Sequence, residues 1–250
     1  MDEKKKYIFV TGASSGIGRN ISMGLSATYN IVLNGRNTER LNETKEKCSK
    51  NTVQIIFQRD LSNICGLEDE LCLFLKENNI EISKFVHCAG FMKMVPLKMI
   101  TIETINTSFA TNIFSAALII KVLTNRRFNN AALTSAVLIS SNISNFGAKA
   151  FSIYGASKAG LDGLMRSLAT ELAPKVRINS VLPGAVKTEM TESIFDDPET
   201  VQRLQAKYPL GLGNANDIFD MVEFLLSEKA RWITGQQFTV DGGRTINITG

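Results

Sequence analysis

Short runs of β-branched and other apolar residues alternate along the chain with longer segments in which apolar residues recur every three or four positions. The short runs predict buried strands, and they lie at 7–10, 30–34, 53–58, 84–88, 135–140, 177–182 and 236–240. The longer segments predict helices, and they lie at 17–27, 38–49, 66–78, 111–125, 152–172 and 214–227. Because strands that alternate with helices form crossover units, we expect an α/β fold, with a doubly wound sheet of seven parallel strands and helices on both faces.

One segment departs from this alternation. Residues 188–212 have weak periodicity and contain the turn-forming stretches "DDP" and "YPLGLG". In an open α/β sheet, an excursion of this kind lies over the carboxyl ends of the strands, where ligands bind. We therefore predict one domain over residues 1–250, with a substrate lid around 188–212.

Composition narrows the classes of partner. The 28 basic and 24 acidic residues are spread along the chain, and no basic stripe with interleaved aromatic residues predicts nucleic-acid binding. The most apolar long stretch, 113–123, is shorter than the roughly 20 residues that cross a bilayer, so no membrane association is predicted. The four cysteines lack the spacing of a zinc site or disulfide framework, which favours reduced thiols, no metal and a cytoplasmic location.

A glycine-rich loop, "FVTGASSGIGRNI", joins the first predicted strand to the first predicted helix and contains Gly12, Gly16 and Gly18. Glycines let a backbone turn sharply and approach a pyrophosphate, whose charge is met by free amides and the positive end of the helix. Structural turns also use glycine, and the spacing here is G-x-x-x-G-x-G rather than G-x-G-x-x-G. The prediction of a Rossmann-type dinucleotide site therefore rests on the position of this loop between the first strand and the first helix.

The end of the second strand, "LNGRNTER", bears on the choice of dinucleotide. A carboxylate at this point accepts hydrogen bonds from a ribose 2′-hydroxyl, whereas an arginine suits a 2′-phosphate. The chain has Arg36 here and Arg40 one turn later, with no carboxylate before Glu39. This pattern favours NADP(H) over NAD(H), although both arginines also suit a solvated helix start.

The stretch "YGASK" places Tyr154 and Lys158 one helical turn apart, with Cβ atoms roughly 5–6 Å from each other. An ammonium so close is expected to lower the pKa of the phenol from about 10 and suit it to proton transfer. Tyrosine and lysine also share helix faces without any catalytic role. The glycine loop and the hydroxyls of Ser140 and Ser141 at the end of the fifth strand favour the catalytic interpretation.

Several motifs in this order resemble those of the short-chain dehydrogenase/reductase family, in its shorter single-domain branch. They are "TGASSGIG" (11–18), "DL" (60–61), "HCAG" (87–90), "TN" (111–112), "SS" (140–141), "YGASK" (154–158), "INSVLPG" (178–184), "KTEM" (187–190) and "ITGQQFTVDGG" (233–243). Within the family, the chain is most similar to 3-oxoacyl-acyl-carrier-protein reductases. The resemblance implies an NAD(P)-dependent oxidoreductase with a Rossmann-type fold.

The same resemblance implies four catalytic residues. Tyr154 is expected to be the general acid/base, and Lys158 to lower its pKa and bind the nicotinamide ribose. Ser141 is expected to orient the substrate carbonyl, with Ser140 as the alternative. Asn112 is expected to hold a water that links Lys158 to solvent.

Cofactor contacts are implied at further positions. Asp60 is expected to contact the adenine, Gly90 to flank the adenine ribose, and Pro183, Gly184 and Thr188 to seat the nicotinamide. The full expected set is Gly12, Ser14, Ser15, Gly16, Ile17, Gly18, Arg36, Asp60, Leu61, Ala89, Gly90, Tyr154, Lys158, Pro183, Gly184, Val186 and Thr188.

Two residues depart from the family pattern "NNAG". Cys88 replaces an asparagine that normally braces neighbouring backbone, and a thiol is a much weaker hydrogen-bonding group. His87 is the only histidine in the chain, and we expect it to be bonded to backbone at a strand end rather than catalytic.

The sequence thus predicts an NADP-dependent oxidoreductase that interconverts a ketone and a secondary alcohol, running as a reductase. A 3-oxoacyl thioester on acyl-carrier protein is one candidate substrate, and Arg126 and Arg127 would meet an acidic carrier unless they are plain solvated surface. The alternatives are a reductase or dehydrogenase of a sugar, polyol or steroid-like alcohol, and a protein that binds NADP without turnover. Family resemblance also implies a homotetramer that pairs through helices 111–125 and 152–172.

Overall fold

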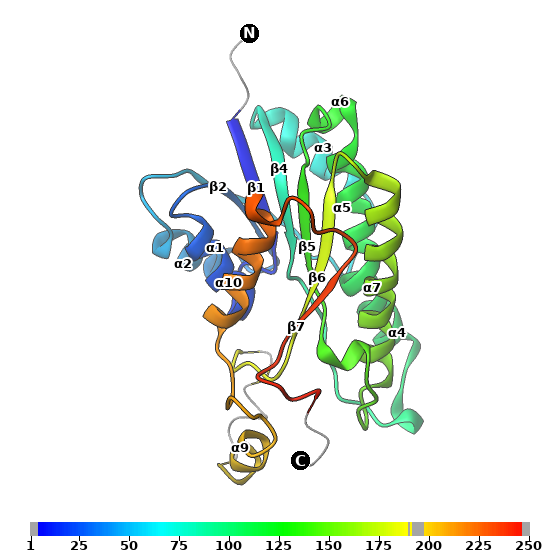
Figure 1. Cartoon of the computed structure of the whole chain (residues 1–250). Coiled ribbons are helices and arrows are strands. Elements are labelled where there is room, and N and C mark those ends of the chain that lie inside the picture. Colours follow the sequence, from blue (N-terminus) through cyan, green and yellow to red (C-terminus); the bar gives the residue numbers. More distant parts are fainter. Residues whose placement is uncertain (1–4, 190, 192–197, 247–250) are drawn as a thin grey trace.

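A twisted sheet of seven parallel strands forms the centre of the computed structural model, which describes residues 5–189, 191 and 198–246 (Figure 1). The strands are β1 Lys5–Thr11, β2 Asn30–Gly35, β3 Gln54–Gln58, β4 Ile80–His87, β5 Ser135–Ile139, β6 Arg177–Pro183 and β7 Gln237–Val240. Their order is β3-β2-β1-β4-β5-β6-β7, so the direction of winding reverses between β1 and β4. The predicted doubly wound, single-domain α/β fold is confirmed.

Helices cover both faces of the sheet (Figure 1). One layer contains α1 Gly16–Leu25, α2 Thr38–Lys47 and α10 Ala215–Leu226, and the other contains α3 Leu67–Glu77, α4 Ile102–Phe109, α5 Ser115–Thr124 and α7 Ser152–Leu172. Two shorter helices, α6 Arg126–Asn129 and α9 Pro198–Gln205, lie near opposite ends of the strands.

The central strands are buried on both sides, which explains their nearly continuous apolar sequences. In β1, Phe9 packs into the core under α3, α5 and α7. Its neighbours Ile8 and Val10 pack into the separate core under α1 and α10. Successive side chains of a strand point to opposite faces, so β1 links two hydrophobic cores.

The structure extends the predicted elements in several places, of which β4, α4 and α9 are the largest. β4 begins at Ile80, earlier than the predicted 84, because residues 80–82 continue the pairing with β1 even though Glu81 interrupts the apolar run. Helix α4 was not predicted, since its polar residues hide the apolar period; the Thr101 side chain caps it by accepting a hydrogen bond from the Thr104 amide. Helix α9 lies inside the predicted lid, which the sequence suggested to be irregular.

Helix α4, a π-helical turn at Ala110–Phe114 and α5 follow one another without a break. Within the described residues, this helix, Ile102–Thr124, is the one candidate that by length and composition could cross a membrane, which is weak support for a span. Half of its most apolar part is buried inside the protein, as in the core helix of a globular domain. Its role in the fold is to carry Asn112 to the middle of the molecule.

Candidate active site

The glycine loop closes tightly against the end of β4. Gly12 has a φ of +66°, and a Cβ atom there would lie 2.8 Å from the backbone nitrogen of Ala89. A Cβ atom on Gly18 would collide with the carbonyl oxygen of Gly12. Glycine at these positions therefore lets β1, β4 and α1 meet at one point.

The first turn of α1 offers an anion-binding end. Ser15, the N-cap residue, makes no capping hydrogen bond through its side chain, and the first turn contains no acidic residue. The Gly16 amide instead donates a hydrogen bond of 2.9 Å to Oε2 of Glu189, far away in the chain. Because a carboxylate already binds this helix end, the loop fits the pyrophosphate of a dinucleotide.

The expected ribose and adenine positions lie around the ends of β2 and β3. Arg36 and Arg40 are exposed, and the Arg36 guanidinium makes no ion pair within the part of the chain that the structure describes. Burial opposes ionisation of Asp60, but hydrogen bonds from Ser62 and the charges of Arg36 and Arg59 keep the pKa of its carboxyl below the usual value. An arginine is thus available at the position expected for a 2′-phosphate.

The other residues expected to contact the cofactor at this edge differ in whether they offer it a side chain or only backbone. Leu61 and Ala89 are buried with their side chains in the core, so each can offer a ligand only its backbone. Ser14 lies against Gly35, where a Cβ atom would be 3.2 Å from the serine hydroxyl. The Ser14 hydroxyl therefore lies beside the end of β2, next to the turn that contains Arg36.

Thr11 braces the join between β1 and β4, a role that sequence reasoning missed. Its hydroxyl oxygen accepts hydrogen bonds of 3.1 Å from the amides of Cys88 and Ala89. It also lies 3.1 Å from Nδ1 of His87. The threonine hydroxyl therefore fixes this segment of backbone although Cys88 lacks an amide side chain.

His87 is fully buried; its Nδ1 lies 3.1 Å from the Thr11 hydroxyl, and the backbone of Thr111 and Asn112 favours its protonated form. Burial is the largest cause that lowers the pKa of His87 to about 3, and the charge of Lys158 lowers it further. The imidazole is therefore neutral at physiological pH. That this histidine has no catalytic role stays a prediction.

Tyr154 and Lys158 point to the same side of α7, toward the end of β5. Both side chains are buried, and the Lys158 ammonium lies 5.9 Å from the centre of the Tyr154 ring. Lys158 Nζ donates a hydrogen bond of 2.8 Å to the carbonyl oxygen of Ile139. The structure therefore brings this pair together at the carboxyl edge of the sheet, as the sequence predicted.

The two serines at the end of β5 differ in orientation. Ser140 Oγ donates to Asp162 Oδ2 at 2.9 Å, so its hydroxyl points into α7. Ser141 hydrogen-bonds the Tyr154 side chain, and its Oγ also accepts a hydrogen bond of 3.3 Å from the Ile143 amide. Ser141 is accordingly the serine beside the phenol, which favours it over the alternative.

The prediction of a lowered tyrosine pKa is wrong for this structure. Burial raises the pKa of Tyr154 to about 12, and the hydrogen bond from Ser141 offsets only part of this effect. Burial also lowers the pKa of Lys158 to about 8. Desolvation of the enclosed phenol is the largest cause, so Tyr154 keeps its proton at neutral pH and is suited to donate it.

Asn112 lies in the π-helical turn and is fully buried. Its Oδ1 accepts from the Phe91 amide at 2.7 Å, and its Nδ2 donates to the Phe91 carbonyl and to Ser157 Oγ. The side chain therefore ties the segment after β4, the helix and α7 together. A π-turn widens the helix and is common at functional sites.

The segment after β6 returns to the glycine loop. A Cβ atom on Gly16 would lie 3.0 Å from the Thr188 side chain, so these two distant residues are neighbours. Tyr208 OH accepts a hydrogen bond of 2.9 Å from the Ala185 amide. Pro183 and Val186 are buried, and Gly184 packs closely on Asp241.

Part of the predicted lid can be placed. Of residues 188–212, positions 190 and 192–197 lie outside the described residues. Helix α9 lies beyond the carboxyl ends of the strands (Figure 1). The placed part of 188–212 is therefore on the side of the sheet where the glycine loop and Tyr154 are found.

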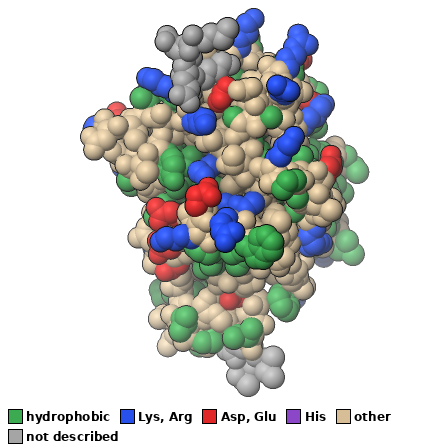
Figure 2. Space-filling view, turned by 45° about the horizontal axis from the view of Figure 1, so that its top comes forward, with side chains coloured by type: hydrophobic (Ala, Val, Ile, Leu, Met, Phe, Trp, Pro, Cys, Tyr) green, Lys and Arg blue, Asp and Glu red, His purple; other side chains and the backbone are tan. Residues whose placement is uncertain are grey.

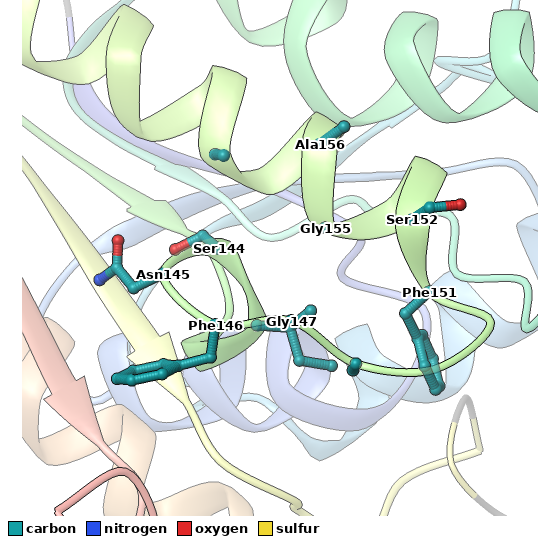
Figure 3. Close-up of a pocket in the computed structure, with 11 residues that line it drawn as sticks. Ser144, Asn145, Phe146, Gly147, Phe151, Ser152, Gly155 and Ala156 are labelled. Atoms are coloured by element: carbon teal, nitrogen blue, oxygen red, sulfur yellow. The ribbon is translucent and has the colours of Figure 1, made fainter.

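A cavity of about 430 Å³ lies between the loop after β5 and the first turns of α7 (Figure 3). Phe146 and Phe151 line it from the loop, and Gly155 and Ala156 line it from the helix. Ser141, Tyr154 and Lys158 do not line it. Two of its lining residues adjoin them, because the Phe151 ring lies 6.2 Å from the Tyr154 ring and the Ile143 amide donates to Ser141 Oγ.

Surface charge gives no strong indication of a macromolecular partner. In Figure 2, lysine and arginine side chains lie among neutral, apolar and acidic ones on the face in view. Arg126 and Arg127 belong to α6, which lies at the end of the sheet opposite α9 and the carboxyl ends of the strands (Figure 1). The two arginines therefore lie at the end of the sheet away from Tyr154.

Comparison with known proteins agrees with this arrangement. The sequence model of the family described as enoyl-(acyl carrier protein) reductase matches residues 12–245. The chain is 31% identical to L-xylulose reductase of Caenorhabditis elegans over 98% of both chains. It is 33% identical to (3R)-3-hydroxyacyl-CoA dehydrogenase of Rattus norvegicus over 94% of both chains.

A solved structure is similar over nearly the whole length. This structure, 4-hydroxyisoleucine dehydrogenase complexed with NADH, has a TM-score of 0.88 and 25% sequence identity, and the match covers 96% of this chain and 99% of that one. The fold, the order of motifs and the relatives lead to the same conclusion. The chain belongs to the short-chain dehydrogenase/reductase family of NAD(P)-dependent oxidoreductases.

Proposed function

We propose that this protein is an NADP(H)-dependent reductase that converts a ketone to a secondary alcohol. The observation that carries the proposal is the meeting of Ser141, Tyr154 and Lys158 at the carboxyl end of β5, beside the glycine loop. The bound nicotinamide cofactor supplies the hydride. The residues of the chain supply position, a proton and charge stabilisation.

Each member of the group has a distinct task in this proposal. Ser141 hydrogen-bonds the substrate carbonyl oxygen and holds it next to the phenol. Tyr154 donates its proton to that oxygen, because burial keeps the pKa of the phenol near 12 and the group protonated. Lys158 stabilises the phenolate that remains and binds the nicotinamide ribose. Asn112 holds a water that links Lys158 to solvent, and this proton relay restores the proton of Tyr154.

The cofactor assignment rests on the end of β2. Arg36 is exposed and unpaired within the described residues, and it would form charge-assisted bonds with a 2′-phosphate. The first turn of α1 with Gly16 and Ser15 would hold the pyrophosphate. Asp60 and Gly90 would flank the adenosine, and Thr188 would seat the nicotinamide.

The substrate class has two candidates. A 3-oxoacyl thioester is supported by the motif resemblance and by the similarity to a 3-hydroxyacyl-CoA dehydrogenase. A ketose is supported by the comparable similarity to an L-xylulose reductase. We favour the thioester, with residues 188–212 as the lid that selects between them.

The remaining parts of the proposal concern assembly and location. A homotetramer would pair through α5 and α7. Phe114 is 46% exposed just before α5, and Ala156 and Ala159 are exposed on α7, so both helices retain apolar surface for a second copy. A cytoplasmic location is proposed from the free cysteines.

The test is a substrate panel with each cofactor. Acetoacetyl-CoA, L-xylulose and a simple cyclic ketone are each offered with NADPH and with NADH, and cofactor oxidation is followed. We expect the highest kcat/KM for acetoacetyl-CoA with NADPH. A higher kcat/KM for L-xylulose would replace the thioester by a ketose, and a preference for NADH would refute the role of Arg36.

A further inference from the structure

A buried carboxylate lies one turn beyond Lys158 on the same helix. Asp162 is 1% exposed, and its Oδ2 accepts the hydrogen bond from Ser140. Its Oδ1 has no hydrogen-bond partner among the residues that the structure describes. Burying a carboxylate costs free energy unless it is paired or compensated by an opposite charge. Asp162 has no part in the reaction proposed for Ser141, Tyr154 and Lys158.

Three successive turns of α7 are each tied to the end of β5. Tyr154 hydrogen-bonds Ser141, and the Lys158 ammonium donates to the carbonyl of Ile139. Asp162 accepts from the hydroxyl of the residue that lies between those two partners. The carboxylate is therefore the third member of a row of side chains spaced four residues apart, on the helix face that holds the catalytic pair.

We propose that Asp162 is the buried counter-charge of Lys158, a positioning residue that keeps the lysine ammonium ionised next to Tyr154. The inference rests on the proposed function, because an ionised Lys158 matters only if Tyr154 exchanges a proton with the substrate. It assigns a role in the reaction to a residue that touches neither substrate nor cofactor.

The charges that face Lys158 support this assignment. Burial lowers the pKa of Lys158, whereas Cys88 and Asp162 raise it. The pKa of Cys88 is itself raised to about 12 by burial, so the thiol is uncharged near neutral pH. Tyr154 and His87 are also neutral there, with pKa values of about 12 and about 3. Among these neighbours, Asp162 is the one with a carboxyl group, and it acts on Lys158 in the direction that favours the charged ammonium.

The experiment measures the titration of Lys158 directly. In protein with ¹⁵N-labelled lysine side chains, the Lys158 ammonium is followed by NMR in the wild type and in Asp162→Asn. We expect the apparent pKa of Lys158 to fall by about one unit in the variant, because the attraction of a nearby opposite charge is lost. The alkaline limb of kcat/KM should move to lower pH by the same amount, and Asp162→Glu should restore most of the shift.

Ser140→Ala is the matched control, since it removes the hydrogen bond and keeps the carboxylate. We expect its Lys158 titration to match the wild type. An unchanged Lys158 pKa in Asp162→Asn, or an equal fall in Ser140→Ala, would overturn the proposal. If thermal unfolding shows that Asp162→Asn is not folded, Asp162→Ala removes the carboxyl group without adding volume and has the same predicted titration.

The NMR measurement separates this inference from the proposed function. If the wild type reduces no ketone but Lys158 still titrates lower in Asp162→Asn, the pairing of charges stands and the assigned reaction fails. If the wild type reduces ketones and the Lys158 titration does not move, the reaction stands and the role of Asp162 fails.

Discussion

The backbone amide of Gly16 donates a hydrogen bond to the carboxylate of Glu189, so an acidic side chain from the segment after β6 lies on the positive end of α1. The same helix end is the expected position of the cofactor pyrophosphate. Two anions compete for one set of amides there. This relationship leads to the first prediction.

Glu189→Gln is expected to bind NADPH several-fold more tightly than the wild type, because the variant removes the competing charge. The measurement is a fluorescence titration of NADPH at low ionic strength, where charge effects are largest. Glu223→Gln, an exposed change on α10, is the control and should leave the affinity unchanged. Equal or weaker NADPH binding by Glu189→Gln would contradict the idea of competition.

Tyr154→Phe should lower kcat at least about 100-fold, since a general acid contributes roughly 10²–10⁴ in rate. NADPH affinity should stay within about twofold, because phenylalanine keeps the ring and loses only the hydroxyl. Steady-state kinetics and a cofactor titration give the two values. A variant that retains wild-type turnover would refute the assignment of Tyr154.

Arg36→Ala should raise the KM for NADPH about 10- to 100-fold and leave the KM for NADH nearly unchanged. The estimate follows from the roughly 1.5–3 kcal/mol of a hydrogen bond to a charged group. Lys45→Ala removes the same charge further along α2 and serves as the control. A parallel change in both KM values would show that Arg36 does not read the 2′-phosphate.

The single histidine should make the protein sensitive to acid. The folded-state pKa of His87 is about 3, below the ordinary 6.5, so the unfolded chain binds a proton that the folded chain does not. Stability should therefore fall as the pH drops from 6.5 toward 3, by about 1.4 kcal/mol per pH unit.

Urea unfolding between pH 7 and pH 5 measures this slope before most carboxylates titrate. His87→Gln keeps a group that can hydrogen-bond Thr11 and removes the titration, so its stability should be much flatter over this range. Identical slopes in the two proteins would mean that His87 is not the group responsible.

Thr11→Val should lower the free energy of unfolding by about 2–4 kcal/mol, because the amides of Cys88 and Ala89 lose their acceptor while they remain buried. Thr124→Val is the comparison, since the Thr124 hydroxyl bonds only within its own helix and the change should cost under about 1 kcal/mol. Chemical denaturation of both variants provides the test. Similar losses in the two variants would argue against the bracing role of Thr11.

Several features of the site could be predicted from sequence because they depend on local spacing. Tyr154 and Lys158 share a helix face because any two helical residues four positions apart do so. The glycines of residues 12–18 mark a turn from strand to helix by their spacing alone. The apolar runs likewise predicted the seven strands, although not the full extent of β4. The helical periodicity did not predict α4 or α9. In those places, polar residues or long-range pairing override the local period.

The sequence by itself therefore determined the strand-helix alternation, the phosphate loop and the spacing of the phenol and amine, because these are properties of neighbouring residues. Only the tertiary structure decided which serine faces Tyr154, that Thr11 braces β4, that Glu189 reaches Gly16 and that Ser140 donates a hydrogen bond to Asp162. It also reversed the expected pKa shift of Tyr154. The physical reason is that contacts between distant segments and the removal of water from a side chain arise only when the layers pack, and the removal of water raises the pKa of an enclosed phenol.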